Sequence, residues 1–94
     1  MKTIVYADEA IKDLQRLREF IARNSPVAAS GIASNLVSRV NLLAEFPQIG
    51  IAVNQATNPD SIRDMFFDKY VVRYSVHTDT IIILRIWHGL ESKE

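Results

Sequence analysis

Five side chains suited to binding a partner or an anion lie near the end of the chain. They fall in three β-rich runs at 62–67, 70–76 and 81–88, and they are Arg63, Arg73, Arg85, Trp87 and His88. Strands hold such side chains rigidly, and a guanidinium presents a planar fork of donors to carboxylates or phosphates. The pattern therefore indicates a sheet that grips another molecule.

The first two arginines each admit a structural and a functional interpretation. Arg63 could form an ion pair with a neighbouring aspartate, cover the sheet edge, or contact a partner. Arg73 alternates with Tyr70 and Tyr74, so it lies on the opposite face of its strand. If the tyrosines face the helices, Arg73 lies on an open face, where it is either solvated or bound to a partner.

The last strand adds a tryptophan and a histidine. Arg85 and Trp87 alternate on one face, and an exposed tryptophan beside an arginine is typical of interface hot spots. Trp87 could equally close the end of the core. His88 could act as a general acid or base because imidazole titrates near neutrality. No partner of matching role is evident, so a structural role is favoured for His88 and no catalytic residue is predicted.

Composition narrows the classes of function. The 94 residues are expected to form one domain, 1–94, and their net charge is zero. A protein that binds phosphates usually has a basic excess, so direct DNA binding by this chain is not favoured. There is no cysteine, and the two histidines lack a carboxylate cluster, so neither a metal site nor a cofactor is expected.

The first residues and the apolar runs of the sequence indicate where in the cell the protein is expected. The first six residues are too short and too soon charged for a signal peptide, and no apolar run approaches membrane-spanning length. We therefore expect a cytoplasmic protein without a membrane partner.

The first sixty residues are predicted to be a scaffold that begins with a short strand and a helix. The strand covers 2–6, and the helix starts with Asp8 as N-cap and ends near 23–24. Apolar residues recur at helical spacing, at Ala10, Leu14, Leu17 and Ile21. The charged residues are predicted to form an ordinary solvent-facing side; they are Lys12, Asp13, Arg16, Arg18 and Glu19.

A second helix is predicted to follow at once. Ser25 can cap it, and Pro26 suits its first position. Its apolar stripe is Ala29, Ile32, Leu36, Val40 and Leu43. Small side chains at 27–34 favour close packing of the two helices as an antiparallel hairpin, and Phe46-Pro47 ends the second helix.

The rest of the chain is predicted to form a loop and three strands. The loop covers 51–59, with a possible extended piece at 51–53. In the middle strand one face carries Tyr70, Val72, Tyr74 and Val76. In the last strand one face is expected to carry Ile82, Leu84, Ile86 and His88, and the other Ile81, Ile83, Arg85 and Trp87. The predicted architecture is α+β, in the order β-α-α-β-β-β, with the helix hairpin on one face of a mainly antiparallel sheet.

An ordered set of short motifs resembles the ParE/RelE superfamily of bacterial toxins from type II toxin–antitoxin pairs. The set begins with Ala10-x-x-Asp13-Leu14, Asn24-Ser25-Pro26 and Leu43-x-x-Phe46-Pro47-x-x-Gly50. It continues with Ile62-Arg63-Asp64-Met65, Tyr70-Val71-Val72-x-Tyr74 and the run from Ile82 to His88. The resemblance spans almost the whole chain and implies the fold just described.

Two branches of this superfamily differ in chemistry. The RelE-like branch cleaves messenger RNA on the ribosome. Its members resemble one another in carrying an arginine directly after the tyrosine that opens the middle strand. Here that position is Val71, which can neither donate a proton nor hold a phosphate. The ParE-like branch is known for inhibiting DNA gyrase. The resemblance is therefore closer to the ParE branch.

We expect a ParE-like toxin that inhibits DNA gyrase by binding it, with the five residues above as candidates for target or antitoxin contact. A ribosome-dependent messenger RNA endonuclease and a non-toxic antitoxin-binding relative are the alternatives. All three imply a cognate, ParD-like antitoxin, which would make the operator DNA contacts.

Overall fold

The computed structural model describes residues 1–23, 25–53 and 61–89, with the backbone alone at 26 and 28–30. Its elements in chain order are β1 (Thr3–Tyr6), α1 (Asp8–Ala22), α2 (Pro26–Asn41), a 3-10 turn (Leu42–Ala44), β2 (Ile51–Ala52), β3 (Ile62–Phe67), β4 (Tyr70–Val76) and β5 (Thr80–His88). This confirms the α+β fold and its order. The short extended piece becomes β2.

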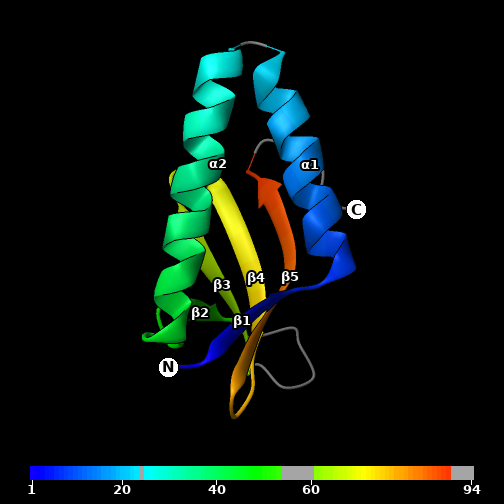
Figure 1. Cartoon of the computed structure of the whole chain (residues 1–94). Helices are drawn as coiled ribbons and strands as arrows, with labels where there is room; N and C mark the ends of the chain where they lie inside the picture. The colour runs from blue at the N-terminus through cyan, green and yellow to red at the C-terminus, as the bar shows by residue number, and fades with distance from the viewer. Residues whose placement is uncertain (24, 54–60, 90–94) are drawn as a thin grey trace.

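The strands form one mixed sheet in the order β1-β5-β4-β3-β2. β1 is parallel to β5, and the other neighbouring pairs are antiparallel. Figure 1 shows α1 and α2 as an antiparallel hairpin across one face of this sheet. We call this the helix face, and the opposite face the open face.

The helix boundaries agree with the sequence except at the first cap and at the end of the second helix, where α2 ends at Asn41 and a 3-10 turn, Leu42–Ala44, separates it from Phe46-Pro47. α1 begins at Asp8 itself, and its N-cap residue is Ala7, which makes no side-chain cap hydrogen bond. The prediction that Asp8 is the cap was therefore wrong, although its charge still suits the positive end of the helix. α1 ends at Ala22; position 24 lies outside the described residues. α2 begins at Pro26, as predicted.

The core lies between the hairpin and the sheet. From the helices it contains Ala10, Leu17, Leu36, Val40 and Leu43. From the strands it contains Met65, Tyr70, Val72, Tyr74, Ile81, Ile83 and Ile86. The alternation predicted that the tyrosines of the middle strand share one face, and the structure turns that face toward the helices. The side chain of Ala29 and the loop at 54–59 lie outside the described part.

A β-bulge makes the predicted alternation of β5 wrong. The register passes from Tyr74–Ile83 to Arg73–Arg85, so Leu84 is an extra residue on β5. Side chains before and after the bulge are out of phase by one position. Ile81 and Ile83 therefore share the helix face with Ile86, not with Trp87.

Candidate partner-binding surface

Arg63 lies on the helix face, at the end of the sheet near the turn after the second helix. It pairs in register with Tyr74, and its Nε donates to the carbonyl of Gly50 at 2.9 Å. The Tyr74 hydroxyl donates to the Pro47 carbonyl at 2.8 Å and accepts the Gly50 N–H at 2.9 Å. Arg63 therefore belongs to a polar junction that holds residues 47–50 against the sheet.

This junction has a tight geometry at Gly50. A Cβ placed there would lie 2.7 Å from the Tyr74 hydroxyl and 2.8 Å from the Asp64 carbonyl. Burial raises the pKa of Tyr74, while hydrogen bonds from Gly50 and Arg63 act in the other direction. The phenol therefore stays neutral and able to donate at physiological pH.

Arg73 lies on the open face and makes two contacts that fix its orientation. Its Nε and one terminal nitrogen donate to the two carboxylate oxygens of Asp64 at 2.8 and 2.9 Å. These hydrogen bonds raise the pKa of Arg73. Its guanidinium carbon also lies 5.2 Å from the centre of the Trp87 ring, within cation–π range. Arg73 and Trp87 are thus brought together, on neighbouring strands.

Arg85 reaches α1 instead. Its Nε and one terminal nitrogen donate to the Asp13 carboxylate at 2.8 and 3.1 Å. The Arg85 side chain remains 47% exposed, whereas that of Asp13 is only 2% exposed. Arg16 forms a second ion pair with the same carboxylate. Arg85 is therefore half covered and tethered to the first helix.

Burial alone would raise the pKa of Asp13. Hydrogen bonds from Arg85, from the Ile86 N–H and from Arg16 outweigh burial and hold the pKa below its ordinary value. Asp13 therefore carries a full negative charge in the folded protein at neutral pH, and it neutralises two arginines.

His88 is buried on the helix face between aromatic rings. Its ring centre lies 5.0 Å from that of Tyr70 in an edge-on arrangement and 6.0 Å from that of Phe20. These ring contacts are with α1 and β4, whereas Arg63, Arg73 and Arg85 bind Gly50, Asp64 and Asp13. The candidates therefore divide among four places: the Gly50 junction, the open face, the contact of Arg85 with the first helix, and the aromatic surroundings of His88. Arg73 and Arg85 are nevertheless register partners on adjacent strands, although their side chains bind different carboxylates.

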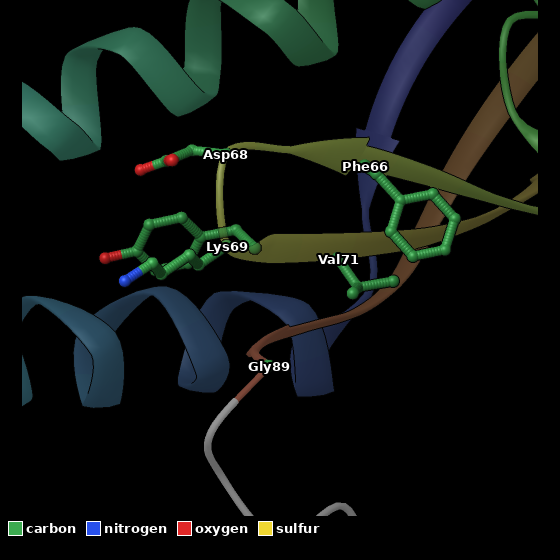
Figure 2. Close-up of a pocket in the computed structure, with 6 residues that line it drawn as sticks. Phe66, Asp68, Lys69, Val71 and Gly89 are labelled. Carbon is green, nitrogen blue, oxygen red and sulfur yellow. The ribbon is translucent and has the colours of Figure 1, made fainter.

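A shallow hollow of about 370 Å³ opens beside the β3–β4 turn. It is lined by Phe66, Asp68, Lys69, Tyr70, Val71 and Gly89. Figure 2 shows Asp68 and Lys69 extending from the turn, away from Phe66 and Val71, which are register partners on adjacent strands. Two apolar side chains thus form the wall that borders the open face.

The open face carries exposed apolar area around one ion pair. Phe66 is 58% exposed and Ile51 is 64% exposed, and they flank Asp64 on the same face because Ile51 pairs with Asp64. Val71, which is only 8% exposed, and Trp87, which is partly buried, are register partners on the same side and form the floor between these exposed residues and Arg73. We call Ile51, Phe66, Val71, Arg73 and Trp87 the open-face patch. An apolar patch around a fixed guanidinium is suited to binding a protein.

Two important residues were missed or misplaced by sequence reasoning. Asp13 was assigned to a solvated helix side, yet it is 1% exposed. The signal available was its position in an Ala10-x-x-Asp13-Leu14 motif, one turn along the buried stripe from Ala10. Tyr74 was assigned to one strand face with Tyr70, but its junction with Gly50 was not foreseen.

Within the described residues, no group of three or more histidines, cysteines and carboxylates is placed to hold a metal ion. No helix in these parts is long and apolar enough to cross a membrane.

Comparison with known proteins places the chain. A sequence model described as the ParE toxin of the type II toxin–antitoxin system parDE matches residues 4–92. The toxin RelE1 of Caulobacter vibrioides is 31% identical, covering 97% of each chain. The toxin RelE2 of the same bacterium is 32% identical, covering 95% of this chain and 97% of its own.

Solved structures show the same fold. A chain of the chromosomal ParDE system from P. aeruginosa superposes with a TM-score of 0.76 at 20% identity, covering 94% of this chain and 96% of its own. The protein HP0894 from Helicobacter pylori gives a TM-score of 0.55 at 16% identity, covering 97% and 98%. With the family match over nearly all of its length, the chain belongs to the ParE toxin family of type II toxin–antitoxin systems.

Proposed function

We propose that the chain inhibits growth by binding DNA gyrase through its open face, without cutting RNA, and that a cognate antitoxin neutralises it. The observation that carries this proposal is the apolar wall of the hollow. Val71, paired with Phe66, stands where the RNA-cleaving branch of the superfamily has an arginine. Phosphoryl transfer needs cations and proton donors around the phosphate, and two hydrocarbon side chains provide neither.

The engagement of the arginines supports binding in place of cleavage. Arg63 and Arg85 are held by Gly50 and Asp13 in separate parts of the fold. Arg73 is neutralised by Asp64. A catalytic site requires its groups to converge on one reacting atom, and these guanidinium groups serve the fold or the open-face patch.

The open-face patch is the surface we assign to the target. It combines exposed apolar area with a guanidinium fixed by Asp64 and an indole under it. Such a combination matches the anchors that dominate protein interfaces. A net charge of zero also suits a protein target better than a phosphate backbone.

The antitoxin is assigned mainly to the other side of the molecule. We expect a flexible C-terminal segment of a ParD-like antitoxin to cover the helix hairpin and part of the sheet, and the antitoxin to make the operator DNA contacts. In this arrangement the chain acts as a co-repressor. Hydrogen exchange with and without antitoxin checks it: protection of α1 and α2 is expected, and their unchanged exchange would contradict it.

A second candidate is a ribosome-dependent messenger RNA endonuclease, favoured by the RelE names of the curated relatives. It would use Arg63, Arg73, Arg85 and His88. It predicts codon-phased cuts in translated messages, suppressed by Arg85→Ala. Intact transcripts during growth arrest would exclude it. A relative that only binds antitoxin would leave growth unaffected on induction.

A matched pair of variants tests the leading proposal. Phe66 and Phe46 are exposed to 58% and 55%, but only Phe66 belongs to the open-face patch. Phe66→Ala should weaken inhibition of gyrase supercoiling by at least tenfold in concentration, because buried aromatic anchors are worth about 2 kcal/mol or more at interfaces. Phe46→Ala, in the turn after the 3-10 helix, should behave as wild type. Unchanged supercoiling at high excess of the wild-type toxin would refute gyrase as the target.

A further inference from the structure

The bulge in β5 decides which side chains reach the open face. After it, Ile86 joins the core and Trp87 stands opposite Val71. A register without the bulge would place Arg85 opposite Val72 and Trp87 opposite Tyr70, both on the helix face, because a slip of one residue exchanges the two faces. The bulge is therefore a condition for the open-face patch.

A single buried carboxylate lies against this bulge. One oxygen of Asp13 accepts the backbone N–H of Ile86 at 2.8 Å and also the Nε of Arg85 at 2.8 Å. Its other oxygen accepts from Arg85 at 3.1 Å. Asp13 thus binds the side chain of Arg85 and the backbone of Ile86, the two residues that follow the bulged Leu84.

Contacts from α1 take the place of a neighbouring strand at Ile86, beyond the point where β1 ends. β1 pairs with β5 from Thr80 to Ile83, and the Ala7 N–H then donates to the Ile83 carbonyl. Beyond that point α1 takes over. Asp13 accepts the Ile86 N–H, and Arg16 donates to the Ile86 carbonyl at 3.1 Å. Both backbone groups of Ile86 that point away from β4 are therefore satisfied by side chains of α1.

We propose that Asp13 is a positioning residue: its contact with Ile86 holds the β5 bulge in register and thereby fixes Trp87 on the open face beside Val71. The inference rests on the proposed function only in assigning that face to the target. A bulge-free register would take the Ile86 N–H away from the buried Asp13 carboxylate, which would keep its ion pair with Arg16. The loss of a hydrogen bond to a buried charged group is costlier than the loss of one to a neutral group. The charge on Asp13 therefore discriminates between the two registers.

The test uses the full chain and an isosteric variant. Asp13→Asn keeps the side-chain size and one acceptor oxygen but removes the charge. It should speed amide exchange at Ile86 by about tenfold, because a hydrogen bond to a charged group exceeds a neutral one by roughly 1–1.5 kcal/mol. Glu19→Gln, on an exposed part of the same helix, is the control and should leave this rate unchanged.

The NMR signal of Trp87 reports the register of β5 directly, which a measurement of overall stability does not. It is the one tryptophan in the sequence, so its indole N–H should give a single NMR signal. Because Trp87 is the register partner of Val71, we expect a nuclear Overhauser effect between the indole ring and the Val71 methyl groups. In Asp13→Asn, and more strongly in Asp13→Ala, a second indole signal lacking that effect should appear. If Asp13→Ala does not fold, Asp13→Asn decides.

The outcomes separate the inference from the proposed function. The positioning role would be overturned if folded Asp13→Asn showed unchanged amide exchange at Ile86 and a single, unshifted Trp87 signal. This holds whether or not the protein inhibits gyrase in the supercoiling assay. A second Trp87 signal, with no effect of wild-type protein on gyrase, would support the positioning role and refute the proposed target. If Asp13 positions Trp87 and gyrase is the target, the inhibition of supercoiling by Asp13→Asn should fall in proportion to the fraction of protein that gives the second Trp87 signal.

Discussion

Two buried tyrosine hydroxyls in this fold allow a matched test of the Gly50 junction. Tyr74→Phe removes a hydroxyl that donates to Pro47 and accepts from the Gly50 N–H. Tyr6→Phe removes a hydroxyl that is also buried but has no hydrogen-bond partner in the described structure. The chemical change is the same in both, so their difference measures the junction.

The size of the effect follows from what Tyr74→Phe leaves behind. Gly50 is buried, so its N–H would lose its acceptor without gaining water, at a cost of about 1–3 kcal/mol. Pro47 is only half-buried, so water can replace the hydroxyl at its carbonyl. We expect a loss of about 2 kcal/mol in the free energy of unfolding, or roughly 8–16 °C in Tm for a domain of this size. For Tyr6→Phe we expect a change within about 0.5 kcal/mol, because no hydrogen bond is lost.

Urea unfolding followed by far-UV circular dichroism measures both variants at neutral pH. Equal m-values would show that the two variants unfold from comparably compact states. If Tyr74→Phe costs no more than Tyr6→Phe, the hydroxyl does not hold residues 47–50 to the sheet, and our reading of the junction fails.

Three further perturbations follow from the same structure. Gly50→Ala should cost about 2–4 kcal/mol of unfolding free energy in urea, because its Cβ would displace the Tyr74 hydroxyl at 2.7 Å; a cost under about 1 kcal/mol would contradict this. The pKa of Asp13 is lowered in the folded state, so its ionised form stabilises the fold above about pH 4 and this contribution disappears as the pH falls through the lowered pKa; the stability gap between wild type and Asp13→Asn should be full at pH 7 and shrink toward pH 2. Asp64→Asn should release Arg73 and change the free energy of unfolding by less than about 1 kcal/mol, since the pair is partly exposed. If this folded variant inhibits gyrase supercoiling only at higher concentration than wild type, the orientation of Arg73 matters for binding.

Most of the fold could be predicted because its signals are local. Pro26 starts the second helix, the Phe46-Pro47 pair follows its end, and period-two alternation in 70–76 grouped Tyr70 and Tyr74 on one face. These depend on backbone preferences and burial patterns that a short window contains.

The β5 bulge could not be predicted because its cause is far away in sequence. Asp13 and Ile86 are 73 positions apart, and a helix-period pattern classifies a charged residue as solvent-facing unless its partners are known. Arg63 does not pair with its sequence neighbour Asp64, because adjacent residues of a strand point to opposite faces. Arg63 therefore bonds Gly50 on the helix face, and Asp64 pairs with Arg73 on the open face. These partners lie on other segments of the chain, so the linear pattern does not identify them.

The topology of a reporter plasmid in living cells tests the central claim most directly. After induction of this chain without its antitoxin, a toxin that binds gyrase should leave the plasmid progressively relaxed within one generation. Co-expression of the antitoxin should restore negative supercoiling, and Phe66→Ala should delay the relaxation. Growth arrest with fully supercoiled plasmid, accompanied by cut transcripts in the same culture, would contradict the account and assign the toxicity to RNA cleavage.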